Sequence, residues 1–549
     1  INVEIGICYK ELEKYEEAIK YYLEANKMQE GKNVWLLSDM AWVYGVMGNN
    51  DEELKYLEEV KKLGRDDEWI YAEYGKVYYK LEQYEKALKF FNKAKKLGQN
   101  DAWINVQIAR CYKGLEKNED ALKAYLKAEK FENNDIWLLS EIAWLYDGIG
   151  KYKEGLKYVK KAIKLGRNDA WINVEYGACL AGLGKYEEAI EKFEYALSLK
   201  DEEKDLAFIY NQLGWCYRLL GDYEKALECY IKSKEEGKND AWTNVEIAMC
   251  YENLNDYEKA LEYALIAYDL DRDDIRSLSE VGWIYNCKEK YEDALPFLLR
   301  AEELGRDDEW LNTEIGINLG RSGKINEGIE RLKKSLTMVD KDNISQKIFI
   351  NSELAWLYGS LEDPQPEEAL KYLNAAKELG RDDEWIHSQI GYQLGYNPEK
   401  SEEALEHFEK AIELGRDDAW IFEVKGIILL DLKRYEEALE SFKKAYDKDN
   451  NGWYLYSMGR CLRGLERYEE AIEILLKSRQ ISLDEEDVVD GEDFELAHCY
   501  IGIGDKENAQ KYLDSARDAI IERGILNDYF KEKIEEIEKG ISSLDILFN

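Results

Sequence analysis

The stretch Arg167–Lys200, RNDAWINVEYGACLAGLGKYEEAIEKFEYALSLK, decides the fold because the chain consists of copies of it. The copy Gln99–Glu132 reads QNDAWINVQIARCYKGLEKNEDALKAYLKAEKFE. Five Trp residues mark the period at intervals of 34 residues: Trp35, Trp69, Trp103, Trp137 and Trp171. Self-similarity at this period is typical of a solenoid, in which each unit buries its apolar face against the next unit.

Each copy is expected to form two amphipathic helices. In the first, Ile172, Tyr176 and Leu180 recur every four residues, which is the spacing of an apolar helical stripe. Asp169 is placed to cap the start of this helix, and Gly184 follows its end. The apolar face of the second helix comprises Tyr186, Ala189, Ile190, Phe193, Ala196 and Leu197. A pair of helices this short cannot bury both faces alone and must stack on its neighbours.

The small residues and rings of the unit follow a known pattern. The residues that carry it are Gly177, Gly184, Tyr186, Ala189, Phe193 and Ala196. They supply the small residue of the first helix, the turn glycine, the aromatic that opens the second helix and its Ala–aromatic–Ala face. In these positions the unit resembles the tetratricopeptide repeat. It departs from that family in two ways: the large aromatic of the first helix lies two residues earlier, at Trp171, and a Gly-Arg-Asp-Asp type junction replaces the terminal proline.

The resemblance covers nearly all of the chain. Fifteen repeats are anchored on the small residue of the first helix: Gly6, Ala41, Gly75, Ala109, Ala143, Gly177, Gly214, Ala248, Gly282, Gly316, Ala355, Gly391, Gly426, Gly459 and Ala497. It implies an all-α solenoid, a right-handed superhelix of about 15 helix–turn–helix repeats. We expect the array to span residues 1–519, with its first repeat truncated at the N-terminus.

Residues 520–549 are expected to form a capping helix and a tail. Ile525–Ser543 reads as an amphipathic helix whose inward residues are Tyr529, Ile534, Ile537 and Ile541. A cap of this kind covers the last repeat of a solenoid. The apolar tail Leu544–Phe548 is expected to fold back on the cap.

Composition limits the class of partner. The 549 residues include 115 acidic and 76 basic side chains, for a net charge of −39. Phosphate binding needs a basic face, so nucleic acid and an anionic membrane surface are not expected as partners. The charge favours solubility and cationic partners, although a solvated acidic outer face explains it more simply. No run of about 18 apolar residues occurs, so we expect no membrane span.

The cysteines indicate the redox environment. Seven of the nine lie two residues after the small residue of a first helix: Cys8, Cys111, Cys179, Cys216, Cys250, Cys461 and Cys499. We interpret these seven as buried core residues. None forms a C-x-x-C pair, so we expect reduced thiols and a cytoplasmic location. The chain begins at Ile1 without an initiator Met, so we expect a piece of a longer protein whose signal peptide cannot be assessed.

Residues that could carry catalysis are sparse. The three His residues, His387, His407 and His498, are expected to have different structural roles. No G-x-S-x-G, Walker or Rossmann loop occurs. Asp447–Gly452 resembles the start of a calcium loop but has Met458 at the twelfth position, where the loop needs Glu. We therefore expect no catalytic residue, no metal, no cofactor and no enzymatic activity.

A second stripe of the first helices carries the aromatic surface. It follows the spacing i, i+4, i+7 and i+11, away from the aliphatic stripe, and all 15 Trp lie on it. Ten occupy its first position: Trp35, Trp69, Trp103, Trp137, Trp171, Trp242, Trp310, Trp385, Trp420 and Trp453. Five occupy its third position: Trp42, Trp144, Trp215, Trp283 and Trp356. Between them runs an acid column of acidic or amide residues: Glu4, Asp39, Glu73, Gln107, Glu141, Glu175, Gln212, Glu246, Glu280, Glu314, Glu353 and Gln389.

In tetratricopeptide proteins this stripe lines the concave groove, so the resemblance implies a peptide-binding surface there. The candidate binding residues are Trp42, Trp144, Trp215, Trp283, Trp356, Glu141, Glu175, Glu246, Glu280 and Arg110. Trp side chains are common binding anchors, and alternating indoles and carboxylates suit a peptide that carries Lys or Arg.

The alternative is that the same residues brace the repeats. Trp side chains of successive repeats would then stack on one another. The acid column would pair with the junction residues Arg65, Arg167, Arg306, Arg381 and Arg416. The regularity of the first-position Trp favours packing for that set. The third-position Trp alternate with other residues, so packing and binding both stay open for them.

The sequence thus predicts a scaffold or adaptor that binds a protein or peptide in its groove. Two other classes of function remain open. The array could self-associate, end to end or laterally, into a larger assembly. It could also be the sensor part of a longer protein whose effector domain precedes Ile1.

Overall fold

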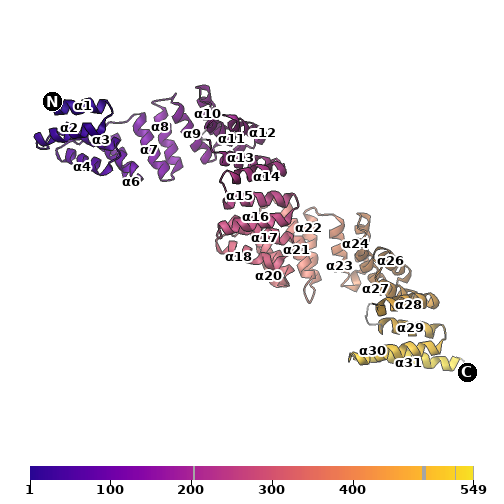
Figure 1. Cartoon of the computed structure of the whole chain (residues 1–549). Helices are drawn as coiled ribbons and strands as arrows, with labels where there is room; N and C mark the ends of the chain where they lie inside the picture. The colour runs from indigo at the N-terminus through magenta and orange to yellow at the C-terminus, as the bar shows by residue number, and fades with distance from the viewer. Residues whose placement is uncertain (202–203, 485–489, 526, 548–549) are drawn as a thin grey trace. The chain divides into compact units, whose positions relative to one another are not determined.

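The structure, a computed structural model, describes residues 1–201, 204–484, 490–525 and 527–547 (Figure 1). Over these residues it contains 31 α-helices, one short 3₁₀ helix and no β-strand. The helices form 15 successive pairs followed by one last helix. The predicted all-α solenoid of about 15 repeats is therefore confirmed.

The first helices of the repeats are α1 (Asn2–Glu11), α3 (Val34–Val46), α5 (Glu68–Lys80), α7 (Ala102–Gly114), α9 (Ile136–Gly148), α11 (Ala170–Gly182), α13 (Leu206–Leu219), α15 (Ala241–Asn253), α17 (Ile275–Cys287), α19 (Glu309–Arg321), α21 (Ile344–Gly359), α23 (Glu384–Leu394), α25 (Ala419–Asp431), α27 (Gly452–Gly464) and α29 (Asp490–Gly502). The second helices are α2 (Tyr15–Met28), α4 (Asn50–Lys62), α6 (Tyr84–Leu97), α8 (Asn118–Glu129), α10 (Tyr152–Lys164), α12 (Tyr186–Ser198), α14 (Tyr223–Glu235), α16 (Tyr257–Leu270), α18 (Tyr291–Glu303), α20 (Ile325–Met338), α22 (Pro366–Glu378), α24 (Ser401–Glu413), α26 (Tyr435–Lys448), α28 (Tyr468–Asp484) and α30 (Lys506–Glu522). The 3₁₀ helix η1 (Pro398–Lys400) precedes α24, and α31 (Asp528–Leu547) ends the chain.

The chain divides into two compact units, Ile1–Glu280 and Val281–Asn549, and the boundary lies inside α17. Within each unit the two helices of a repeat pack against each other, and each pair packs against the next pair along the chain. This nearest-neighbour packing is what a stacked repeat requires.

The small residue of each first helix sets how closely the two helices of a repeat approach. A Cβ atom on Gly177 would lie 2.7 Å from Phe193 Cε1, and one on Gly75 would lie 2.5 Å from Phe91 Cε1. Phe193 and Phe91 are fully buried. The ring of the second helix therefore occupies the volume that a larger side chain on the first helix would need, which is the close packing typical of protein interiors.

The junction between repeats places each first-position Trp in the first turn of a helix. Gly166 has a φ of +108°, a left-handed conformation that glycine adopts at little cost. Two residues before Trp171, the Asp169 side chain accepts a hydrogen bond of 2.9 Å from the Ile172 backbone N–H. This bond caps α11, as predicted. The indole consequently stands at the start of the helix, where the neighbouring helices only partly cover it.

The terminal helix α31 spans Asp528–Leu547, where Ile525–Ser543 was predicted, and one of its predicted inward residues is wrong. Ile534, Ile537 and Ile541 are buried as expected, but Tyr529 is 64% exposed. Phe530 packs against Phe494 instead, with ring centroids 6.3 Å apart. The reason is helical geometry, because position 530 lies four residues before Ile534 and shares its face, whereas position 529 does not.

The expected tail continues the same helix. Leu544 is 7% exposed and lies within α31, which extends to Leu547, so the prediction that the tail folds back is wrong for these residues. Phe548 lies outside the described residues.

Six of the seven aligned cysteines are buried, which supports their interpretation as core residues, but Cys8 is exposed. In later repeats this position faces the preceding repeat: Cys179 Sγ, for example, would lie 3.0 Å from a Cβ on Gly155 of α10. Cys8 lies in α1, and no helix pair precedes α1 among the described residues. Cys229 and Cys287 lie off this column and are half-buried.

Candidate functional site: the Trp-bearing face of the first helices

All 15 Trp residues lie in the described part of the chain, and none of their side chains is buried. Six are exposed: Trp35, Trp103, Trp137, Trp144, Trp171 and Trp453. The other nine are half-buried. The stripe that carries them therefore forms a surface, whereas the aliphatic stripe of the same helices forms the core.

The first-position Trp contact the preceding repeat. Trp103 packs edge-to-face on Phe91, with ring centroids 6.1 Å apart, and Trp137 packs in the same way on Tyr125 at 6.0 Å. The expected stacking of Trp on Trp is therefore wrong for these two residues, although Trp283 and Trp310 do form a tilted pair at 6.4 Å. The usual partner is the central ring of the preceding second helix, because the first turn of the next helix lies against it. These contacts support a packing role for the first-position set.

Among the described residues, the junction arginines pair with the capping Asp of the following helix, where pairs with the acid column were expected. Arg167 Nε lies 2.8 Å from Asp169 Oδ2, and its guanidinium lies 4.5 Å from the Trp171 ring centroid. The same pair of contacts recurs at four further junctions, on Arg65, Arg306, Arg381 and Arg416. The capping Asp is only two residues away from the Arg, so the short loop favours this local pair.

The acid column instead pairs with bases at the end of the preceding first helix. Lys113 Nζ lies 2.7 Å from Glu141 Oε2 and 4.4 Å from the Trp144 ring centroid. We call this arrangement a cation junction: a basic residue of one first helix contacts both the acid and the third-position Trp of the next. Two other cation junctions are Lys10 with Asp39 and Trp42, and Arg321 with Glu353 and Trp356. Three of the five predicted third-position Trp are thus held by a cation of the protein itself.

The bases of the cation junctions were not predicted from the sequence. The signal was available, since a basic residue follows the small residue of the first helix by four or five positions in each of these repeats. Arg218 and Arg463 occupy the same position and pair with Glu246 at 2.6 Å and Glu495 at 2.5 Å. Their pairing depends on stacking, because the base and its acid lie at least 28 residues apart.

Glu246, a predicted binding residue, is 2% exposed and has three partners. It accepts ion pairs from Arg218 and from Arg276, the latter at 2.8 Å, and a hydrogen bond of 3.2 Å from the Tyr230 hydroxyl. A carboxylate this well satisfied stabilises the stack of repeats and leaves little capacity for a ligand.

Two other predicted binding residues, Arg110 and Trp215, also contact rings of the chain itself. Arg110 lies 4.9 Å from the Trp137 ring and is half-buried. Trp215 packs edge-to-face on Tyr186 at 6.1 Å. The repeat of Trp215 carries the amide Gln212 in the acid column, and no base precedes it at the position of Lys113.

Two junctions carry an acid at the position where the cation junctions carry a base. Asp147 occupies the position of Lys113 and faces Glu175, and Glu252 occupies it before Glu280. Burial raises the pKa of Glu175 to about 8, with further contributions from Asp147 and Glu141 that exceed the opposing effect of Arg167. Burial, assisted by Glu252, likewise raises the pKa of Glu280 to about 8.

Glu175 stands out because it is also buried beside a cavity. Its side chain is 7% exposed, and its Oε2 atom has no hydrogen-bond partner. The cavity measures about 640 Å³ and is lined by Trp144, Trp171, Val174, Phe208 and Ile209 together with charged residues of the junction. It brings two predicted residues, Trp144 and Glu175, to one place.

The acid column is interrupted in the thirteenth and fourteenth repeats before it resumes at Glu495, and the surface is apolar at the start of this interruption. Val424 takes the place of the acid in the thirteenth repeat. A hollow of about 220 Å³ at this point is lined by Tyr392, Tyr396, Ile427 and Ile428 as well. The surface therefore varies along the array, which a recognition surface requires and a pure packing device does not.

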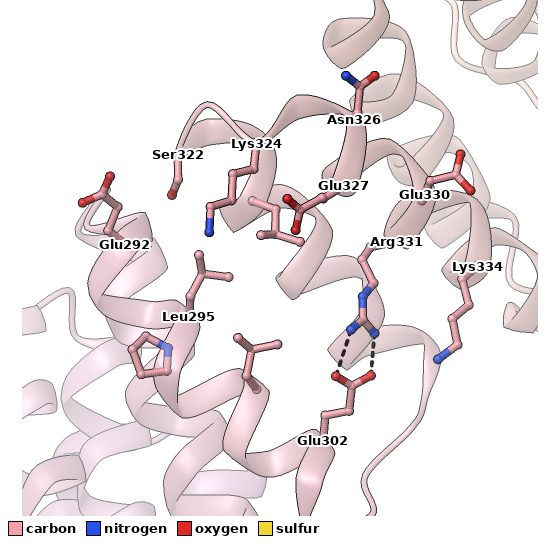
Figure 2. Close-up of a pocket in the computed structure, with 13 residues that line it drawn as sticks. Glu292, Leu295, Glu302, Ser322, Lys324, Asn326, Glu327, Glu330, Arg331 and Lys334 are labelled. Carbon is pink, nitrogen blue, oxygen red and sulfur yellow. Dashed lines mark hydrogen bonds and ion pairs between the residues drawn. The ribbon is translucent and has the colours of Figure 1, made fainter.

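A second concavity is lined mainly by two second helices, α18 and α20. A cavity of about 1170 Å³ separates α18 from α20, with Leu295, Pro296, Leu299 and Leu319 among its lining residues (Figure 2). Beside this cavity α20 packs closely on α19, since a Cβ on Gly328 would lie only 2.7 Å from the Gly316 carbonyl oxygen.

Several of the charged residues around this second cavity are engaged in ion pairs within the chain. Arg331 donates two hydrogen bonds to Glu302, as Figure 2 shows, and Lys334 lies 2.8 Å from Asp307. No Trp lines it. It offers apolar contact without the indoles of the Glu175 cavity.

Two of the three histidines contact each other, whereas different structural roles were expected for them. His387 Nδ1 lies 2.9 Å from His407 Nδ1, and His387 Nε2 lies 2.9 Å from Asp382 Oδ1. Burial lowers the pKa of His407 to about 4. α23 and α24 of one repeat face each other, which brings these rings together.

The described part of the chain holds no group of three or more His, Cys, Asp or Glu side chains placed to bind a metal ion. In the calcium-like stretch, the Asn451 side chain accepts a hydrogen bond of 2.9 Å from the Trp453 N–H and caps α27. Among the residues that the structure describes, no helix is long and apolar enough to cross a bilayer.

The fold is similar to several solved repeat structures. YrrB, a tetratricopeptide protein described as having an unusual peptide-binding site, is 23% identical over 34% of this chain and 95% of its own, with a TM-score of 0.28. Cut9–Hcn1 of the APC/C is 12% identical over 84% of this chain and 95% of its own, with a TM-score of 0.39. MamA of Desulfovibrio magneticus RS-1 is 20% identical over 32% and 98%, with a TM-score of 0.29. A comparison with curated proteins gives no match.

Family models agree with the repeats. Three models, each described as tetratricopeptide repeat, match residues 168–235, residues 399–452, and residues 1–31, 70–101, 243–274 and 454–484. The matches fall on helix pairs whose glycine, ring and alanine positions the structure packs as described above. The chain belongs to the tetratricopeptide repeat family.

Proposed function

We propose that the chain is a non-catalytic scaffold that binds a protein partner through the Trp-bearing face of its first helices. The observation that carries the proposal is the partial exposure of all 15 indoles on one stripe. Large amphipathic rings on a rigid helical surface supply contact area with little loss of conformational entropy when a partner binds.

The charge of this face supports a partner with cationic side chains. The acid column carries Glu175 and Glu280, carboxyl groups with raised pKa values that a cation of the partner would ionise. The chain as a whole has a net charge of −39. Opposite charge on the partner would speed association and favour the correct partner over others. The same net charge disfavours nucleic acid and anionic membranes.

The third-position Trp are the binding anchors in this proposal, and the first-position Trp brace the repeats. Trp144 is 37% exposed although Lys113 lies over its ring. Trp103, in contrast, packs on Phe91 of the preceding repeat. The two sets should therefore respond differently when the indole is removed.

The proposal is tested by capture of partners from the native source on the purified chain, followed by mass spectrometry and titration of the recovered peptides. Quenching or a blue shift of Trp fluorescence on peptide addition, with a monomer seen by light scattering, supports it. A chain that forms ordered assemblies and binds no peptide would establish self-association in its place.

A further inference from the structure

The junction between α9 and α11 departs from a cation junction at two positions at once. Asp147 stands at the position of Lys113, and Ala178 stands at the position of Trp144, while the acid column keeps Glu175. The Asp147 Oδ1 atom, like the Oε2 atom of Glu175, is buried and has no hydrogen-bond partner. The Asp147 carboxylate does have one side-chain partner, the Cys179 thiol, so Glu175 is the less satisfied of the two. A buried carboxylate without a partner is unfavourable, so Glu175 is suited to a cation that comes from outside the chain.

The cavity beside Glu175 has the shape and composition for such a cation. It measures about 640 Å³, enough for a Lys or Arg side chain, and two indoles, Trp144 and Trp171, line it. Both indoles are 37% exposed. The faces of Trp rings attract ammonium and guanidinium groups, and the aliphatic stem of the ligand would lie against Val174 and Phe208.

The basic residues at the cavity are engaged by other groups. Arg167 Nε lies 2.8 Å from Asp169. Lys204 Nζ donates hydrogen bonds of 2.7 Å to the carbonyl oxygens of Leu197 and Leu199. Neither base takes the role at Glu175 that Lys113 takes at Glu141.

The remaining charges around the cavity are acidic. Three aspartates line it, and each accepts a hydrogen bond from the N-terminal backbone of a helix: Asp169 from Ile172, Asp201 from Ala170, and Asp205 from Phe208. Their charges give the cavity a local potential that attracts cations.

We propose that this cavity binds one Lys or Arg side chain of the protein partner, an inference that rests on the proposed function. The cation of the partner pairs with Glu175 as Lys113 pairs with Glu141. The indoles of Trp144 and Trp171 flank its stem. The partner thus supplies the cation that the chain lacks beside Glu175.

The ionisation of Glu175 supports this assignment. Its pKa is raised to about 8 by burial and by Asp147 and Glu141, against the effect of Arg167. A cation placed at its carboxylate lowers that pKa, so binding releases a proton near neutral pH. The other groups that face the site are Asp169, Asp201, Lys204 and Asp205, which line the same cavity. The Cys179 thiol also lies close to both Asp147 and Glu175, and burial raises its pKa.

The test uses the full chain labelled with 5-fluorotryptophan, and Trp144→Phe and Trp171→Phe assign the two relevant ¹⁹F resonances. The probe is a capped Gly/Ser peptide with one central Lys, compared with the same peptide carrying ε-acetyl-lysine and with one carrying Arg. We expect the Lys and Arg peptides to shift both resonances and the acetylated peptide to leave them in place. Equal shifts from the acetylated peptide, or no shift with any probe, would overturn the inference.

Two variants locate the binding. Glu175→Gln should weaken binding of the Lys peptide by about tenfold or more, the effect of losing one charge-assisted hydrogen bond. Asp147→Lys supplies an internal cation on the pattern of Lys113 and should displace the peptide while raising the melting temperature. Glu187→Gln removes the same charge from an exposed position of the same repeat and should change affinity by less than about twofold.

The outcomes separate this inference from the proposed function. If captured partner peptides bind the Trp face and Glu175→Gln leaves their affinity unchanged, the scaffold function stands and the Lys site is wrong. If Mg²⁺ or Ca²⁺ alone shifts the same two resonances in a Glu175-dependent way, the site takes a metal ion and the inference is also wrong. If no peptide binds anywhere on the face, both fail.

Discussion

Lys113 Nζ lies 2.7 Å from Glu141 Oε2, and the two residues belong to the first helices of successive repeats. The same ammonium group lies 4.4 Å from the ring centroid of Trp144. One base therefore ties two repeats together and covers part of an indole that would otherwise be a binding surface. Where a repeat has this base, its acid is satisfied; where it has Asp147 instead, Glu175 is not.

Replacing Trp144 and Trp215 together by Ala should weaken partner binding more than it lowers the melting temperature. Trp144 is 37% exposed, so its removal takes away contact area for a partner and little of the core. Affinity is measured by calorimetry with a captured peptide and stability by thermal unfolding. Trp103→Ala is the matched comparison, since Trp103 packs on Phe91 and should affect stability first. A larger loss of stability than of binding in the double variant would show that these indoles are structural.

Lys113→Met should destabilise the chain by about 1–3 kcal/mol, because it leaves Glu141 half-buried without its ion-pair partner. The double variant Lys113→Met with Glu141→Gln should recover part of this loss, since no uncompensated charge remains. Urea unfolding of the two single variants and the double variant gives the coupling energy. Additive effects would mean that the 2.7 Å contact contributes nothing measurable.

Glu175→Gln should stabilise the chain at high pH and have little effect near pH 5. The pKa of Glu175 is raised to about 8 in the folded chain, against about 4.3 in an unfolded one, so folding favours the protonated form. The wild-type chain consequently loses stability as pH rises from about 4.3 through 8, by roughly 2–4 kcal/mol, and the amide removes this loss. Thermal unfolding of both proteins from pH 5 to pH 9 checks the prediction. A constant difference across that range would contradict the raised pKa.

Gly177→Val should destabilise the chain by about 1–3 kcal/mol because the new side chain would overlap Phe193. The comparison is Gly148→Ala in α9, where an added Cβ meets no atom within 4 Å. This second variant should be neutral or gain about 0.5–1 kcal/mol, since Ala favours a helix over Gly. Equal losses in the two variants would refute the packing argument for the small residue.

Partner affinity should fall as salt is added if the face recognises cations, because ions screen the charges of the acid column. Titrations at several salt concentrations measure this slope. The slope should be smaller for Glu175→Gln than for the exposed variant Glu187→Gln. An affinity independent of salt would argue for recognition by the indoles alone.

The sequence by itself determined the helices, the number of repeats and the stripe on which every Trp lies. These features follow from local rules: the 3.6-residue period, the capping Asp169 and the small residue at Gly177 each act within one repeat. Tyr529 shows the limit of this reasoning, because a shift of one residue on α31 decides which ring is buried.

Only the tertiary structure decided which base satisfies which acid. Arg167 was expected to serve the acid column but pairs with Asp169, and Lys113 serves Glu141 from 28 residues away. The physical reason is that a contact of this kind depends on the register in which one repeat stacks on the next. Residues at the same position of different repeats therefore contact different residues of the neighbouring repeat. Glu175 lacks an ion-pair partner of this kind because Asp147, and not a base, lies beside it.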